Sequence, residues 1–339
     1  AFFIVAGYFA AMMLERRAPA AWLRSRLTRL GIPFLTGLVL LAPVQIALID
    51  IHAAMTGAAA LTEALNRAAR DVTHPDFSWI MHLWFLPALI AYSILLVLFQ
   101  TLVPSTLKSG WGDRARSLCS ARPGLALGLL VATVALWEVL VNQSQQLLLS
   151  IDGALAYLLA HGIDPYLRYL PFFFVGAALR SLSEVRAALV WRSGWTLPAV
   201  AITTAVVASL LRGRDASGLD MAHNAVDGAA AVLVSLVLIG IAERFLNRPD
   251  PRVDRIVDAS FSIYLLHHPI IYALATLFLL VSWPPLAEFA VICLVTFLLS
   301  YAAHRLIRRS AFALFLFNGV PISRRAGKDG TTGGVTTLR

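Results

Sequence analysis

Two adjacent histidines lie near the middle of a long apolar segment, SFSIYLLHHPII at residues 260–271. An ionisable side chain deep in a membrane is a candidate for function. His267 and His268 point about 100° apart on a helix, so they should not chelate one metal ion as an i, i+4 pair can. Pro269 lacks the N–H that would bind the carbonyl of Leu265. We expect one functional and one packing histidine, with at least one facing a polar cavity and contacting a polar group of another helix. The alternative is that each only ties two helices together.

Two polar residues precede these histidines at helical spacing. Tyr264 lies four residues after Ser260 and three or four residues before the histidine pair, so both lie on the same side of the expected helix as one of the histidines. The resulting polar stripe would run from the inner face of the membrane to its middle. Both residues are therefore candidates for lining the route of a substrate.

A third histidine, His82, lies in MHLWFLP at residues 81–87, between Trp79 and Trp84. Aromatic faces stack on sugar rings, and a neutral imidazole can take a proton from a hydroxyl. The pattern therefore also suits a carbohydrate site, in which His82 is a catalytic candidate and the two tryptophans could shape the acceptor side. The alternative is an interfacial tryptophan anchor beside a structural histidine.

Three arginines are closely spaced in WLRSRLTRLGIPF at residues 22–34, namely Arg24, Arg26 and Arg29. The planar guanidinium group matches the oxygen atoms of a phosphate. This stretch could therefore bind a phosphorylated donor. The alternative is a basic amphipathic segment that lies on the anionic inner leaflet.

Glu138 is a carboxylate inside an expected span, with Asn142 four residues later. A charged group there is costly, so Glu138 is a candidate for substrate binding. The pair could also serve only to join helices. Cys119 and Cys293 have no ligand spacing, so no metal site and no disulfide are expected.

The composition places these residues in membrane-spanning helices. Apolar residues make up 59% of the chain, charged residues only 14%, and the mean hydropathy is +0.75. A soluble domain would carry about 25% charged residues, and several apolar runs reach the roughly 17–25 residues of a membrane helix. The sequence therefore predicts an all-α, polytopic membrane helix bundle of about nine spans. The spans are expected at 1–14, 32–50, 80–102, 124–142, 166–180, 195–211, 225–243, 258–281 and 286–304.

The basic residues fall mostly on one side of this topology. If alternate connections lie inside, 23 of the 28 lysines and arginines are on the inner face. That bias is what the positive-inside rule predicts. The net charge of +9 is therefore an orientation signal, with a cytoplasmic C-terminus, and nucleic acid is not an expected partner.

The two ends of the chain differ from the rest. The first apolar run reaches Glu15 after a stretch of about 21 Å, which is shorter than the ~30 Å hydrocarbon core. We therefore expect that upstream sequence, including a span, is missing. An integral-membrane domain is expected over 1–309. A cytoplasmic, disordered tail is expected over 310–339, because residues 327–339 are rich in glycine and threonine.

The ordered set of motifs resembles membrane acyltransferase family 3, and within it the glucan-biosynthesis protein C group. The resemblance rests on FFIVAGYFAAMMLERR, RSRLTRLGIPFLT, HLWFLPALIAYSI, FFFVGAALR and SFSIYLLHHPII, spread over nearly the whole apolar region. It implies an all-α bundle of ten or eleven spans in a bacterial inner membrane. It also implies an O-acyltransferase that moves acyl groups, such as succinyl, from a cytoplasmic coenzyme A thioester to hydroxyls of an external polysaccharide or glucan.

The resemblance also assigns some residues. Arg26 and Arg29 match the family's Arg-x-x-Arg motif, which implies donor binding or structural support. The family's Arg and His about ten residues apart would precede Ala1, so the likeliest catalytic histidine is expected upstream of this numbering. The expected partners are an acyl-coenzyme A donor, a glucan acceptor and the lipid bilayer. Coenzyme A thioester would be a co-substrate, and no bound cofactor is expected.

The mechanism expected from these residues is acyl transfer in which a histidine acts as general base or carries the acyl group briefly. A different class of protein would show similar features. A transporter or flippase of a lipid-linked or acidic solute also places polar groups and a helix break at mid-membrane. A scaffold without activity is a third reading. Acylation of glucan that depends on a thioester separates the first class from the other two.

Overall fold

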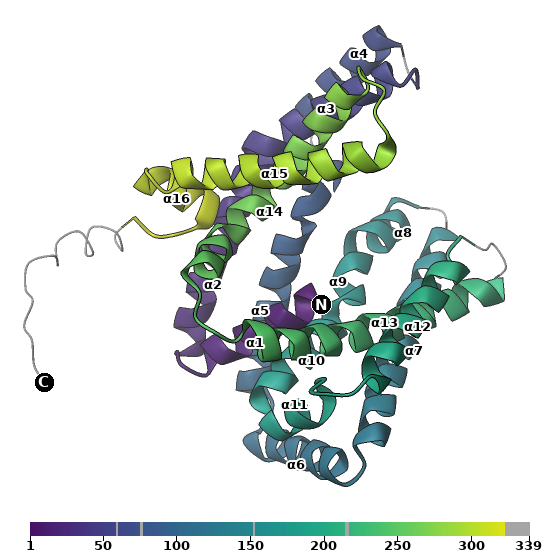
Figure 1. The fold of residues 1–339 in the computed structure, drawn as a ribbon, viewed down its shortest axis with the longest axis vertical. Helices are drawn as coiled ribbons and strands as arrows, with labels where there is room; N and C mark the ends of the chain where they lie inside the picture. The colour runs from purple at the N-terminus through teal and green to yellow at the C-terminus, as the bar shows by residue number, and fades with distance from the viewer. Residues whose placement is uncertain (59, 75–76, 152, 214–216, 323–339) are drawn as a thin grey trace, which may run out of the picture. The chain divides into compact units, whose positions relative to one another are not determined.

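The computed structural model describes residues 1–58, 60–74, 77–151, 153–213 and 217–322 (Figure 1). These residues form helices, and the described ranges contain no strand, which confirms the all-α class. The helices up to residue 149 are α1 (Phe2–Leu14), α2 (Pro19–Thr36), η1 (Gly37–Leu41), α3 (Ala42–Met55), α4 (Leu61–Thr73), η2 (Phe77–Trp84), α5 (Phe85–Leu102), α6 (Ser105–Ala121) and α7 (Pro123–Leu149). The later helices are α8 (Ala154–Leu158), η3 (Leu159–Ile163), α9 (Asp164–Arg168), α10 (Leu170–Ser181), α11 (Ser183–Leu189), α12 (Thr196–Leu211), α13 (Ser217–Ile241), η4 (Ala242–Leu246), α14 (Pro251–Phe278), α15 (Pro285–Ile307) and α16 (Ala311–Asn318).

Six helical segments among the described residues are long and apolar enough to cross a membrane, and each overlaps one of the expected spans. They are Pro19–Met55, Trp79–Leu102, Pro123–Leu149, Gly218–Leu246, Pro251–Phe278 and Pro285–Ile307. Two further expected spans, 1–14 and 195–211, coincide with the shorter apolar helices α1 and α12. The prediction of a polytopic helix bundle is therefore confirmed.

The expected span 166–180 is wrong as a single helix. α9 ends at Arg168 and α10 begins at Leu170, with Tyr169 between them. Pro171 lies in the first turn of α10, where a missing N–H costs no hydrogen bond. The residues on both sides of this point are mostly apolar, so hydropathy alone predicts one continuous span. The break is marked by the proline in the first turn of α10, which a hydropathy pattern does not register.

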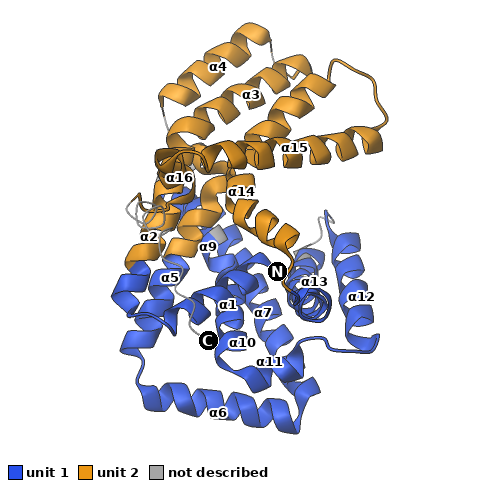
Figure 2. Cartoon of the chain, turned by 60° about the vertical axis from the view of Figure 1, so that its left-hand side comes forward, with its two compact units in different colours: residues 1–23, 91–248 blue, residues 24–90, 249–339 orange. Residues whose placement is uncertain are grey.

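The chain divides into two compact units, each built from two separate stretches of sequence (Figure 2). Unit 1 comprises residues 1–23 and 91–248, and unit 2 comprises residues 24–90 and 249–339. The division passes through α2 and α5, so each of these helices contributes to both units. The single membrane domain expected over 1–309 stays a prediction.

Within unit 1, glycines bring α1 and α10 into close contact. A Cβ at Gly7 would lie 1.9 Å from the carbonyl oxygen of Phe173, and a Cβ at Gly176 would lie 1.8 Å from that of Ile4. No side chain fits in either place. Small residues let helices approach closely where lipid offers no hydrophobic drive for association. The other large packing surface of unit 1 joins α13 to α7 and α12.

Within unit 2, α2 continues through the π-helical turn η1 into α3, so residues 19–55 form one helical segment. Pro33 lies inside α2, where it removes a main-chain donor just before that turn. The arginines expected in a connection between spans therefore lie on the same helical segment as the second span. α14 packs against α3 and α15, and this arrangement positions the residues of the candidate site.

The disordered tail expected from residue 310 is wrong for its first part, because residues 311–318 form α16. Ser310 caps this helix by accepting a hydrogen bond from the backbone of Ala313. The helix forms because its sequence, AFALFLFN, is apolar and has a cap at each end, with Gly319 in the left-handed conformation. The glycine- and threonine-rich stretch lies outside the described residues.

Candidate active site

The three histidines that the sequence places in two separate motifs lie together in unit 2. The ring of His82, from η2, stacks on that of His268, from α14, with centroids 4.5 Å apart and planes 18° apart. The ring of His267 meets the ring of His82 edge-on, with 5.3 Å between their centroids. We call these three residues the histidine cluster.

The helix break at Pro269 explains part of this arrangement. The carbonyl of Leu265 has no N–H partner at residue 269, because proline carries none. The Nε2 atom of His82 lies 3.3 Å from that carbonyl oxygen and donates a hydrogen bond to it. His82 therefore replaces a main-chain bond that α14 lacks, which fixes its ring beside His268.

Gln45, from α3, is a partner that the sequence reading missed. Its side chain is completely buried, and its Oε1 atom lies 2.5 Å from Nδ1 of His268. This contact confirms the prediction that one of the adjacent histidines meets a polar group of another helix. His267 instead has its Nδ1 atom 2.6 Å from the carbonyl of Tyr264, on its own helix. The one available signal for Gln45 was a single polar residue inside the apolar run GLVLLAPVQIALI.

Tyr264 belongs to the same site, whereas Ser260 does not. The hydroxyl of Tyr264 donates to the carbonyl of His82 at 2.6 Å, and the rings of these two residues are 5.8 Å apart. Ser260 is exposed and donates to the carbonyl of Val257 on its own helix. The hydroxyl of Ser260 is thus satisfied by the turn before it, and its expected place in a polar stripe stays a prediction.

The backbone next to His82 is strained. The expected span 80–102 begins with the 3₁₀ segment η2, and Met81 has φ 36° and ψ −126° inside it. Positive φ is rare for a residue with a long side chain, and such positions cost roughly 1–3 kcal/mol. The kink lies one residue before His82, in a segment that we expected to be a regular helix.

The two tryptophans expected beside His82 have other contacts. Trp79 donates its indole N–H to the carbonyl of Asp71, at the end of α4, over 2.7 Å. Trp84 packs edge-on against Phe85, with ring centroids 6.5 Å apart. Their expected role on the acceptor side stays a prediction.

The arginines lie on α2, with Arg26 and Arg29 one turn apart. Arg24 and Arg29 are exposed, and Arg26 is half-buried. Gly319, just after α16, packs directly against this turn, since a Cβ there would lie 2.4 Å from Cα of Arg29. Gly319 also has φ 60°, so two constraints require glycine. The end of α16 therefore supports the arginine-bearing turn.

A second polar cluster of unit 2 joins α14, α15 and α16. The hydroxyl of Ser262 lies 2.8 Å from Nδ1 of His304 and donates to Oδ1 of Asn318 at 3.0 Å. Asp258 forms an ion pair with Arg308 at 2.8 Å and lies 3.8 Å from Nε2 of His304. Sequence reasoning missed this cluster, because its members come from three separate helices. Its contacts hold α16 on the other two helices.

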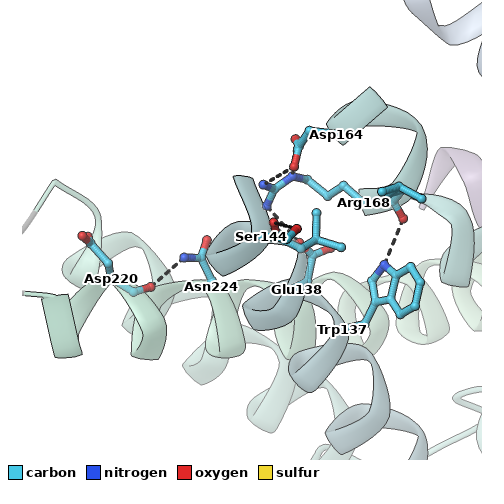
Figure 3. Close-up of polar contacts among 9 residues, drawn as sticks. Trp137, Glu138, Ser144, Asp164, Arg168, Asp220 and Asn224 are labelled. Atoms are coloured by element: carbon cyan, nitrogen blue, oxygen red, sulfur yellow. Dashed lines mark hydrogen bonds and ion pairs between the residues drawn. The ribbon is translucent and has the colours of Figure 1, made fainter. Parts of the chain in front are cut away.

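Glu138 lies on α7 in unit 1. Its carboxylate is buried and pairs with Arg168 at 3.0 Å, and Arg168 also pairs with Asp164 at 3.2 Å (Figure 3). Trp137, the neighbour of Glu138, donates to the carbonyl of Leu167. This network ties α7 to α9 and explains how a carboxylate is tolerated there. A substrate-binding role of Glu138 stays a prediction.

The histidine cluster offers bases and hydrogen-bond donors but no metal centre. Among the residues that the structure describes, no group of three or more His, Cys, Asp and Glu side chains is arranged to hold a metal ion. The lone pairs of an imidazole lie in its ring plane, so stacked rings cannot direct them at one ion. The chemistry that such a site supports is proton transfer to and from a substrate.

Comparison with protein families identifies the class. The model of a family described as an acyltransferase domain matches residues 1–305, and the chain belongs to this family. Together with its membrane-length helices, this makes it a multi-pass membrane acyltransferase.

The chain is similar to curated proteins called Glucans biosynthesis protein C. It is 26% identical to the one from Escherichia coli O6:K15:H31, over 96% of this chain and 82% of that protein. It is 28% identical to the one from Salmonella gallinarum, over 79% of this chain and 68% of that protein. The one from Shigella dysenteriae is 26% identical over 96% of this chain and 82% of its own length. No solved structure gives a significant match.

Proposed function

We propose that the protein transfers an acyl group, succinyl or acetyl, from a cytoplasmic coenzyme A thioester to hydroxyls of a periplasmic glucan or another polysaccharide. The observation that carries this proposal is the histidine cluster, in which His268 is held by Gln45 and stacks on His82. Membership of the acyltransferase family supports the reaction type. The name of the relatives supports a glucan as acceptor.

In this mechanism His268 is the general base. It takes the proton of an acceptor hydroxyl while the hydroxyl oxygen attacks the carbonyl carbon of the thioester. The tetrahedral intermediate then collapses as its carbon–sulfur bond breaks, and the leaving thiolate takes the proton back from the imidazolium. The products are an ester of the acceptor and the free thiol of coenzyme A. A positioned base of this kind typically contributes about 10²–10⁴-fold to the rate.

The donor would approach along the helical segment that contains α2 and α3. Arg29 and Gln45 are separated by sixteen residues of nearly continuous helix, which corresponds to roughly 24 Å. A donor whose phosphates contact Arg26 and Arg29 must therefore extend a long arm to bring its thioester to His268. Coenzyme A carries its phosphates and its thioester at opposite ends, which suits this separation.

Replacing Arg26 or Arg29 with alanine is expected to weaken use of the donor. Losing one hydrogen bond to a charged group costs about 1.5–3 kcal/mol, which is roughly 10- to 100-fold in apparent donor affinity. The measurement is the dependence of the acylation rate on donor concentration in membranes with matched protein levels. Arg114→Ala, which changes an exposed arginine of α6, is the control. An unchanged donor dependence in the Arg26→Ala/Arg29→Ala double variant would assign the pair to the membrane surface instead.

We also propose that the protein lies in the bacterial inner membrane with its C-terminus in the cytoplasm. The bias of lysines and arginines toward one set of connections supports this orientation. A reporter enzyme that is active only in the cytoplasm should be active when fused after Arg309. Activity of a periplasm-specific reporter at the same position would overturn the orientation.

The reaction itself can be tested with membranes that carry the full-length protein. Succinyl- or acetyl-coenzyme A with a labelled acyl group is supplied on the cytoplasmic side, and glucan on the other side is analysed by mass spectrometry. We expect ester-linked label on the glucan and release of free coenzyme A in equal amounts. Movement of a solute across the membrane with no acylated product would select the transporter or flippase reading.

A further inference from the structure

Gln45 is an unusual residue for its position. It lies on α3 inside a membrane-length apolar helix, and none of its surface is exposed. Its Nε2 atom is buried and has no hydrogen-bond partner among the described residues. An unsatisfied buried donor costs roughly 1–3 kcal/mol, so an apolar residue of the same size would pack here at lower cost. The glutamine therefore needs an explanation other than packing.

The contact between Gln45 and His268 determines where His268 carries its proton. An amide oxygen has lone pairs and no hydrogen, so it can only accept. Since Oε1 of Gln45 lies 2.5 Å from Nδ1 of His268, that nitrogen must carry the hydrogen. In a neutral imidazole the other nitrogen then has a free lone pair. Nε2 of His268 makes no hydrogen bond to any of the described residues, so none of them occupies this lone pair.

The neighbouring histidine, His82, carries its proton on the other ring nitrogen. Nε2 of His82 donates to the carbonyl of Leu265, so a neutral His82 has its lone pair on Nδ1. That atom is buried and has no partner among the described residues. His267 contacts the carbonyl of its own helix, which keeps it from competing for Gln45. Each ring of the stacked pair therefore donates one hydrogen bond to an oxygen of another residue, His82 to the carbonyl of Leu265 and His268 to the amide of Gln45.

We propose that Gln45 is a positioning residue that holds His268 with its proton on Nδ1 and its lone pair on Nε2. This inference rests on the proposed function for the role of His268, which needs that lone pair to take a proton from the acceptor hydroxyl. It adds a residue from a separate helix to the catalytic machinery. It also explains why a side chain with an oxygen acceptor lies in the apolar interior of α3.

The first test reads the proton position directly and requires no acyl transfer. The full-length protein, labelled with ¹⁵N at its histidine rings, is examined by NMR in lipid, and a His268→Gln variant identifies the signals of His268. We expect a protonated Nδ1 and an unprotonated Nε2 in the wild type. Gln45→Leu, which has no acceptor, should lose this preference, whereas Gln45→Glu should retain it. A proton on Nε2 in the wild type overturns the proposal.

The second test measures catalysis in the same variants. Gln45→Leu should lower kcat by roughly 10- to 100-fold with little change in the donor KM, because it removes a hydrogen bond to the imidazolium that forms during the reaction and not a binding contact. Gln45→Glu should recover most of that loss, since its carboxyl oxygen accepts the same hydrogen bond. An unchanged kcat in Gln45→Leu overturns the proposal.

A matched control comes from the same two helices. Thr276 of α14 contacts His52 of α3, with 3.4 Å between Oγ1 and Nδ1. Thr276→Val removes that polar contact without touching His268, so it should leave the proton position and kcat unchanged. The two proposals can fail separately. A wild type with the expected proton on Nδ1 but no acylation of any acceptor would remove the proposed function and leave the positioning of His268 in place.

Discussion

Replacing His268 with alanine should lower the rate of acyl transfer by about 10²–10⁴-fold, the contribution of a positioned general base. The ring of His268 is the one that is held from another helix by Gln45 and stacked on His82. His267→Ala should have a smaller effect, below roughly tenfold, because its hydrogen bond goes to the carbonyl of Tyr264 on its own helix and its ring otherwise packs against neighbouring rings. The measurement is the rate of ester formation on the acceptor at matched protein levels.

The control for this experiment is His161→Ala. His161 is exposed in unit 1, and its ring stacks on Tyr157 within the same helical turn. This variant should acylate at the wild-type rate. A His268→Ala variant that inserts normally and keeps more than about half of the activity would remove His268 from the mechanism.

Replacing Arg168 with alanine should strongly destabilise unit 1. The side chain of Glu138 is only 8% exposed, and Arg168 is its cation at 3.0 Å. Removing one partner of a buried ion pair leaves an uncompensated charge, which lowers the free energy of unfolding by about 3–5 kcal/mol. The measurement is the fraction of folded protein after graded heating in detergent. We expect Arg168→Ala to unfold at a clearly lower temperature than the wild type.

Two further variants make this result specific. Adding Glu138→Gln to Arg168→Ala removes one of the two carboxylates that Arg168 pairs with, so the double variant should recover part of the lost stability. Arg116→Ala is the control, because Arg116 forms an exposed ion pair with Asp113. This variant should lower the free energy of unfolding by no more than about 1 kcal/mol. If Glu138→Gln abolishes acylation while its thermal unfolding matches the wild type, Glu138 has a substrate role that the ion pair does not explain.

The sequence was sufficient to predict the membrane-length helices, but not all of their ends and not helices such as α4 and α6, which lie in the expected connections. Long apolar runs specify a spanning helix because lipid leaves the backbone no other partner. The break at Tyr169 and the helix at 311–318 were missed for opposite reasons. The apolar run 166–180 contains a proline at the start of α10, and a hydropathy pattern does not distinguish such a helix start from a continuous helix. The short apolar helix α16 was counted as part of the tail because the residues after it are polar and rich in glycine.

The candidate site was predicted in part for a related reason. His82, His267 and His268 stand out because an ionisable residue in an apolar run is costly wherever it lies. A local sequence pattern does not predict that the three histidines contact one another or that Gln45 binds His268. These contacts depend on how α3 packs on α14. Ser262 lies within the quoted motif and was still missed, because its partners His304 and Asn318 come from two later helices.

The hydrogen bond from His82 to the carbonyl of Leu265 has a consequence for natural variation. That carbonyl lacks its usual helical donor because residue 269 is a proline. A descendant with any other residue at 269 would recover a main-chain N–H, which would compete with His82 for the same oxygen. A descendant that lost the histidine at 82 would leave the carbonyl without a donor as long as the proline remained. Substitutions at these two positions are therefore conditional on each other, although they lie in distant parts of the sequence.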